Sequence, residues 1–163
     1  ISGYTAKVAG TEAGITEPVS AFSACFGAPF MPLHPGKYAE MLGNKMEEAG
    51  VNVWLINTGW TGGPYGTGER MKLRYTREMI TAALTGELNS VDFENHEIFG
   101  VLIPKSCPNV PDELLNPKNT WESKSAYDEK ANHLADLFNK NFEQFEEGVS
   151  KEILEASPKG VMA

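Results

Sequence analysis

The chain has 163 residues, of which 41% are hydrophobic and 10% aromatic, a composition that suffices for a hydrophobic core and argues against a disordered chain. Its net charge of -8 disfavours a general nucleic-acid or anionic-membrane surface. No apolar run reaches the roughly 18 to 20 residues that cross a bilayer, and the two cysteines lie far apart, so we expect a soluble protein of the reducing cytoplasm.

The first fifty residues predict two short extended segments and a helix. Residues 1–12 alternate weakly, as in a short strand or an extended loop, and the apolar run AFSACF from Ala21 indicates a buried strand or a tightly packed turn. Prolines then exclude regular structure as far as Pro35. The following helix should end at Gly50, with an apolar face formed by Tyr38, Met41, Leu42, Met46 and Ala49.

A second strand is expected at Val51–Ile56, VNVWLI, because this β-branched and aromatic run is typical of a strand buried in an α/β sheet. A loop follows that contains Gly59, Gly62, Gly63, Gly66 and Gly68. Thr76 is then a plausible N-cap for a helix that ends at Gly86. The apolar positions of that helix are Met79, Ile80, Ala83 and Leu84.

The carboxyl-terminal part predicts a strand, a surface segment and a long helix. Strand character lies between Val91 and Pro104, and four prolines in or beside residues 105–119 indicate a path over the surface. The long helix follows from apolar residues every three or four positions, at Tyr127, Ala131, Leu134, Phe138, Phe142, Phe145 and Val149. Residues 1–163 therefore read as one mixed α/β unit, and the start at Ile1 without Met suggests a piece of a longer protein.

The glycine loop does not match the common phosphate-binding patterns. Gly63 and Gly68 have the spacing of a Walker loop, but Glu69 and Arg70 stand where that motif needs Lys and Ser or Thr. The dinucleotide pattern GxGxxG fails as well. The glycine pattern therefore supports two interpretations about equally: a loop that contacts a ligand, and a long surface loop without a ligand.

Four cations after the loop favour an anionic ligand, because they follow a strand and precede a helix N-terminus. They are Arg70, Lys72, Arg74 and Arg77. A solvated charged loop is the alternative. The three histidines lack the spacing of a metal site, and Cys25 lies in an apolar run as an inert thiol would.

Four motifs, in order along nearly the whole chain, resemble the carboxyl-terminal part of ATP-dependent phosphoenolpyruvate carboxykinase. They are GYTAKVAGTE, FSACFGAPFMPLHP, NTGWTGGPYGTGERM, and LNPKNTW followed by a long helix. The resemblance implies an α/β mononucleotide-binding domain of that family with a mixed sheet, of which residues 1–163 form the carboxyl-terminal part, without the P-loop half. It also implies a cytoplasmic, gluconeogenic decarboxylase that converts oxaloacetate and ATP to phosphoenolpyruvate, carbon dioxide and ADP, as a monomer when complete.

By motif, the resemblance assigns Arg70 and Met71 to the two sides of the adenine and Thr76 to a hydrogen bond with it. The family's P-loop, its catalytic Lys, its ligands for a divalent metal (Mg or Mn) and its oxaloacetate-binding Arg would all precede this chain. We therefore expect no catalytic residue, no metal ligand and no carboxykinase activity in the segment alone. A non-catalytic nucleotide-binding module, or a segment that only supports the missing part, stays an alternative.

Overall fold

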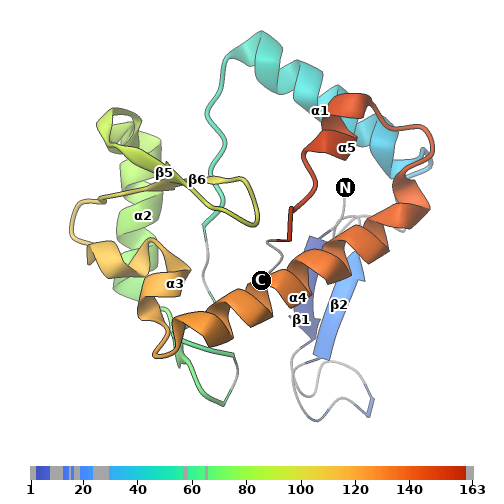
Figure 1. Cartoon of the computed structure of the whole chain (residues 1–163). Coiled ribbons are helices and arrows are strands. Elements are labelled where there is room, and N and C mark those ends of the chain that lie inside the picture. Colours follow the sequence, from blue (N-terminus) through green and yellow to red (C-terminus); the bar gives the residue numbers. More distant parts are fainter. Residues whose placement is uncertain are drawn as a thin grey trace. The chain divides into compact units, whose positions relative to one another are not determined.

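The computed structural model describes residues 3–7, 13–14, 16, 19–23, 30–56, 59–64 and 66–160. The chain divides into two compact units (Figure 1). The first unit contains residues 1–52 and 134–160, and the second contains residues 53–133 and 161–163. The described residues mix helices with three two-stranded antiparallel sheets, which agrees with the predicted mixed α/β class at this coarse level.

In the first unit, strands β1 (Gly3–Lys7) and β2 (Val19–Ser23) form an antiparallel hairpin in which Thr5 lies opposite Ala21. This hairpin confirms extended structure in the first segment, and in the second it shows a strand as far as Ser23; residues 24–26, including Cys25, lie outside the described residues. Helix α4 (Lys124–Phe142) brings Phe138 against Phe22, with ring centroids 5.3 Å apart in an edge-to-face arrangement. An aromatic contact therefore joins the hairpin to the carboxyl-terminal half of α4.

Helix α1 (Pro35–Ala49) begins at His34, whose Nδ1 accepts a hydrogen bond from the backbone N–H of Gly36 at 3.1 Å. It ends at Gly50, in the left-handed conformation, as predicted. The predicted apolar face is wrong for Met41 and Leu42, which are exposed. The buried residue of α1 is Gly36, where a Cβ atom would lie 2.5 Å from Val149 Cγ1, so the lack of a side chain there makes room for Val149.

Residues that follow α4 lie against the start of α1. Helix α4 is followed by the short helices η4 (Glu143–Phe145) and α5 (Lys151–Glu155). The ring of Phe145 lies 6.1 Å from that of His34 and 6.3 Å from that of Phe142. The prediction of a long helix is confirmed as far as Phe142, but its apolar repeat continues into η4 and a turn rather than one unbroken helix.

Residues 51–56 form no strand, so the prediction of a buried strand at Val51–Ile56 is wrong for this chain. None of the described strands pairs with these residues, and an unpaired strand leaves its backbone groups without ladder hydrogen bonds. Val51, Val53 and Leu55 are exposed, Leu55 by 85%. Trp54 is half-buried and packs against the core of the second unit, with its ring centroid 6.1 Å from that of Phe93.

The core of the second unit lies between helix α2 (Leu73–Thr85) and the segments that follow it (Figure 1). It is formed by Ala82, Leu88, Cys107 and Val110. Helix α2 ends at Gly86 as predicted, and the 3-10 helix η2 (Glu87–Ser90) then places Leu88 in the core. Of the predicted apolar positions, Ile80 and Leu84 are exposed, because the buried side of α2 is formed by Thr76 and Ala82.

The strand predicted between Val91 and Pro104 is a hairpin of two short strands, β5 (Phe93–Asn95) and β6 (Leu102–Pro104). The turn closes at His96, whose N–H donates to Val101 O at 2.9 Å while its carbonyl accepts from Gly100 N at 2.8 Å. Two short helices, η3 (Asp112–Leu114) and α3 (Pro117–Thr120), then lead to α4. No described helix is long and apolar enough to span a membrane.

Candidate functional site

The glycine loop is the turn of a short antiparallel hairpin. Strand β3 (Trp60–Thr61) pairs with β4 (Glu69–Arg70), so that Trp60 lies opposite Arg70. The N–H of Gly68 donates to Pro64 O at 2.8 Å and closes the turn. Beyond the last pair, Met71 N donates to Gly59 O at 2.8 Å. The hairpin therefore fixes the backbone of Arg70 and Met71 relative to residues 59–61.

The glycines of this hairpin serve different steric needs. A Cβ atom on Gly68 would lie 2.6 Å from Thr61 O and would also overlap Gly63 O, so only glycine fits at that position. Gly66 has no atom within 4 Å of its Cβ position, but its φ of +87° favours glycine. The loop is thus shaped by backbone contact at one point and by backbone conformation at another.

The predicted site residues lie around the turn from β4 into α2. Arg70 is exposed, whereas Met71 and Thr76 are buried, the latter with 6% of its surface exposed. Among the described residues, no carboxylate forms an ion pair with Arg70. The guanidinium group is therefore open to an anionic or aromatic partner.

Thr76 is not the N-cap of α2, and that prediction is wrong. The helix begins at Leu73 after Lys72, whose extended backbone lets its carbonyl accept hydrogen bonds from Tyr75 N at 2.9 Å and Thr76 N at 3.4 Å. Thr76 is therefore in the first turn of the helix. In the described part of the chain its hydroxyl makes no hydrogen bond, so capping does not compete with a ligand for it.

The four cations after the loop are all exposed, which leaves a positive stretch on an acidic chain. Arg74 differs from Arg70, because its guanidinium lies 4.5 Å from the ring centroid of Tyr75 and donates to the Tyr75 hydroxyl at 2.5 Å. Arg74 is thus held against Tyr75, whereas Arg70 forms no ion pair with a carboxylate among the described residues.

Two surface depressions lie elsewhere in the second unit. The larger, about 550 Å³, is lined by Arg74, Tyr75, Glu78, Asn109, Val110 and Pro111. The smaller, about 260 Å³, is lined by residues of β5, β6, η3 and α3 and their connections. Arg70, Met71 and Thr76 line neither of these two depressions.

Thr120, which the sequence analysis did not single out, links the β3–β4 hairpin to α3. Its Oγ1 accepts hydrogen bonds from Gly62 N at 3.0 Å and from Thr61 Oγ1 at 3.1 Å, and it donates to Pro117 O at 2.8 Å. One signal could have located helix α3: Asn116 followed by Pro117 is a typical helix start. Asn116 Oδ1 indeed accepts from Lys118 N at 3.1 Å.

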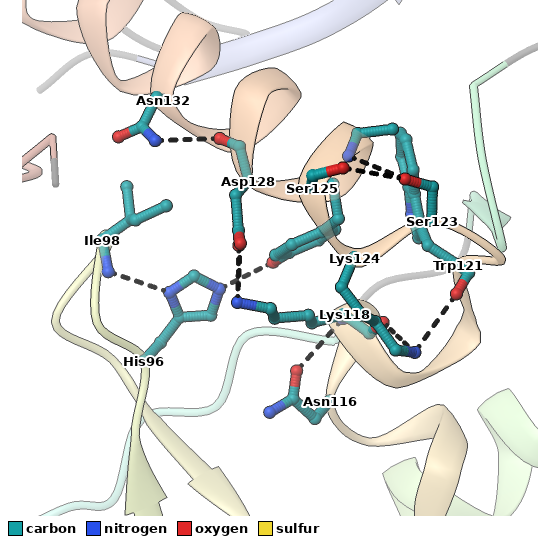
Figure 2. Close-up of polar contacts among 12 residues, drawn as sticks. His96, Ile98, Asn116, Lys118, Trp121, Ser123, Lys124, Ser125, Asp128 and Asn132 are labelled. Carbon is teal, nitrogen blue, oxygen red and sulfur yellow. Dashed lines mark hydrogen bonds and ion pairs between the residues drawn. The ribbon is translucent and has the colours of Figure 1, made fainter. Parts of the chain in front are cut away.

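The carboxyl end of α3 is held by lysines (Figure 2). Lys124 Nζ donates to the carbonyls of Lys118, Asn119 and Trp121 at 2.8, 3.0 and 3.1 Å. A cation at these carbonyls complements the unpaired acceptors at the end of a helix. Lys118 Nζ points to the carboxylate of Asp128 on α4 and lies 2.7 Å from its Oδ1.

A buried His–Tyr pair joins the β5–β6 turn to α4. His96 Nδ1 accepts from the N–H groups of Ile98 and Phe99, both at 3.3 Å, so the neutral ring donates from Nε2 to Tyr127 Oη at 2.7 Å. Burial lowers the pKa of His96 and raises that of Tyr127. Burial also raises the pKa of the Cys107 thiol, as expected for a structural rather than a reactive cysteine.

Comparison with known proteins gives the family. The family profile of phosphoenolpyruvate carboxykinase matches residues 1–113. The chain is 69% identical over 158 residues to phosphoenolpyruvate carboxykinase (ATP) of Flavobacterium johnsoniae, and 66% identical over 158 residues to that of Christiangramia forsetii. Each alignment covers 97% of this chain and 30% of the relative.

A more distant relative gives the same result. Phosphoenolpyruvate carboxykinase (ATP) of Thermus thermophilus is 55% identical over 159 residues, which cover 98% of this chain and 30% of that protein. The chain thus spans about 30% of the length of the curated relatives it matches. The resemblance noted from four motifs is confirmed, and the chain belongs to the ATP-dependent phosphoenolpyruvate carboxykinase family.

Proposed function

We propose that this chain supplies the adenine side of the nucleotide site in an ATP-dependent phosphoenolpyruvate carboxykinase. The complete enzyme would convert oxaloacetate and ATP to phosphoenolpyruvate, carbon dioxide and ADP, as a cytoplasmic, monomeric enzyme of gluconeogenesis. Residues 1–163 would be the carboxyl-terminal part of its mononucleotide-binding domain. The observation that carries this proposal is the strand-to-helix turn that holds Arg70 and Met71 on one hairpin in a member of this family.

The side chains of this turn have the chemistry that an adenine needs. An exposed guanidinium such as that of Arg70 can stack on an aromatic base, and the thioether of Met71 offers an adaptable apolar surface. The Thr76 hydroxyl has no hydrogen-bond partner among the described residues and could bond a ring nitrogen of the base. Its burial requires that the base approach closely or that the turn open slightly.

The phosphoryl-transfer part of the site would come from outside this chain. Phosphoryl transfer needs a metal ion and cations placed around the moving group. Among the described residues, no group of three His, Cys, Asp or Glu side chains could hold a metal ion, and no metal-dependent step is assigned to these residues. We propose that the ligands of the divalent metal and the oxaloacetate site lie in the other part of the enzyme, and that the segment alone is inactive.

The experiment is Arg70→Ala in the complete enzyme, with steady-state kinetics for both substrates. We expect the KM for ATP to rise about tenfold, the effect of losing roughly 1.4 kcal/mol of binding, while the KM for oxaloacetate stays unchanged. Arg74→Ala is the matched control, since it removes a neighbouring exposed arginine that is held on Tyr75. The isolated chain, which should consume no ATP, serves as the blank.

Unchanged ATP kinetics in the Arg70→Ala enzyme would refute the adenine-side role. An equal rise in the KM for ATP with Arg74→Ala would show that the whole positive stretch acts as a diffuse field rather than through one contact.

A further inference from the structure

We propose that Thr120 is a positioning residue for the nucleotide site, because its hydroxyl holds the hairpin that carries Arg70 and Met71. This inference rests on the proposed function, in which the hairpin contacts the adenine of ATP. The hydrogen bonds of Thr120 with Thr61, Gly62 and Pro117, which we call the Thr120 tie, link the hairpin to α3. Thr120 itself is not assigned a contact with ATP.

The Thr120 hydroxyl is fully used by these three bonds. A threonine hydroxyl has one proton to donate and two lone pairs that accept. Here the proton goes to Pro117 O, and the lone pairs accept from Gly62 N and Thr61 Oγ1. The hydroxyl therefore has no free donor or acceptor, and its bonds hold Thr61 and Gly62 at the start of the glycine loop.

The other side of the tie is held firmly. Helix α3 is only four residues long, yet the Asn116 side chain satisfies an N–H at its start and Lys124 satisfies carbonyls at its end. Asn116 Nδ2 also donates to Glu94 Oε1 at 2.6 Å, which links α3 to strand β5. Thr120 therefore projects from a short helix whose own orientation is fixed at both ends.

The position of Gly62 is passed to the site through the hairpin. Gly62 directly follows β3, and β3 pairs with the strand that contains Arg70. Its φ of +76° favours glycine, and a Cβ atom there would lie 3.3 Å from Thr120 O, which is a tight contact. If the tie is released, the β3 end of the hairpin gains freedom, and Arg70 on the paired strand loses its fixed geometry.

Two substitutions of Thr120 in the complete enzyme distinguish the effect of its hydroxyl group from the effect of its side-chain volume. Thr120→Val keeps the volume but removes every hydrogen bond of the hydroxyl, while Thr120→Ser keeps the hydroxyl. Thr67→Val is the matched control, because Thr67 is an exposed threonine in the same loop. The first measurement is amide hydrogen exchange at Gly62 without nucleotide, and the second is steady-state kinetics with ATP and oxaloacetate.

We expect Thr120→Val to speed exchange at Gly62 about tenfold, as loss of one hydrogen bond allows, and to raise the KM for ATP about three- to tenfold with a smaller change in kcat. Thr120→Ser should restore both values, and Thr67→Val should change neither. A residue needed only for folding would lower the active fraction and hence kcat, without a selective effect on the KM for ATP.

Each contrary result has a separate meaning. Unchanged exchange at Gly62 in Thr120→Val would overturn the tie itself. Faster exchange with unchanged ATP kinetics, in an enzyme in which Arg70→Ala does raise the KM for ATP, would overturn the positioning role and leave the proposed function intact. Faster exchange with ATP kinetics that neither Thr120→Val nor Arg70→Ala alters would overturn the proposed function, and with it the role of the tie in nucleotide binding.

Discussion

Residues 51–56 and residues 59–71 are close in the sequence but differ in what holds them. The second segment is a hairpin with a closed turn, two paired strands and a tie to Thr120. The first has a stronger strand propensity, yet it has no regular secondary structure, pairs with no described strand and is largely exposed. Local polar contacts therefore shape the hairpin, whereas the propensity of the earlier segment does not produce a strand.

This contrast shows that a strand depends on its neighbour more than on its composition. β-propensity largely measures the fit of a side chain to a paired, half-buried surface. The hairpin contains its own partner strand within ten residues, so its contacts form within the segment itself. Residues 51–56 need a partner from elsewhere, and this chain spans about 30% of the length of its relatives.

The largest effect should come from breaking the hairpin at its tightest point with Gly68→Ala. The added methyl group would overlap the carbonyl oxygens of Thr61 and Gly63, which belong to the backbone and cannot rotate away. We expect the hairpin to lose about 3 kcal/mol, the upper range for overpacking. Amide exchange of Met71, whose N–H is bonded to Gly59 O, measures this loss directly.

Gly66→Ala is the control for the Gly68 substitution. Its Cβ position has open space, so the cost should be about 1 kcal/mol, from the left-handed backbone conformation alone. Equal changes in the exchange rate of the Met71 amide in both variants would show that steric contact at Gly68 does not determine the loop conformation. The hairpin would then lack the tight packing that distinguishes it from residues 51–56.

The sequence predicted those parts of the molecule whose determinants are local. Gly50 and Gly86 end their helices as expected, because a residue without Cβ adopts the left-handed conformation readily. The motif NTGWTGGPYGTGERM also indicated the family correctly. The start of α2 was misplaced at Thr76, since the helix begins after Lys72 without a side-chain cap, and a sequence search for Ser, Thr, Asp or Asn cannot detect such a start.

Other features that the sequence did not reveal concern pairing and burial, which depend on segments elsewhere in the fold. Val51–Ile56 has the composition of a buried strand but lacks a partner among the described strands, and Leu84 has helical spacing but faces outward. The bond between Gly62 and Thr120 spans 58 residues and joins the glycine loop to the last residue of α3, so no periodic pattern reveals it. The roles of Arg70, Met71 and Thr76 stay predictions, because they concern a ligand rather than the fold.

A smaller effect is expected on pH dependence, and it tests whether the second unit is held by specific polar contacts. The pKa of His96 is lowered by burial and by Lys118, against the opposing carboxylates of Glu97, Asp128 and Glu94. The unfolded chain thus binds more protons between the folded and unfolded pKa values. The stability from neutral His96 is fully present above the unfolded pKa of about 6.5 and is lost as pH falls through the folded value.

Protonation would also remove the Nδ1 acceptor that holds two N–H groups of the β5–β6 turn. Urea unfolding of the chain at several pH values between 7.5 and 5 should show a loss of stability on acidification, on the scale of about 1.4 kcal/mol per pKa unit. His96→Asn offers an amide oxygen in place of Nδ1 but does not titrate, so its profile should be flatter. Parallel profiles for the two proteins would show that His96 is not responsible for the pH dependence.

The smallest effect in this chain is expected at Leu55, and it sharpens the contrast most. Because this side chain is 85% exposed, Leu55→Ala should change the stability of the isolated chain by no more than about 0.5 kcal/mol. In the complete enzyme we expect a paired, buried strand at residues 51–56, where the same substitution should cost about 2–5 kcal/mol. Leu88→Ala, at a position 4% exposed, should cost that much in both proteins. Denaturant unfolding of both variants in both proteins measures these losses of stability. A small loss for Leu55→Ala in both proteins would mean that residues 51–56 form no buried strand in the complete enzyme either, despite their strand propensity.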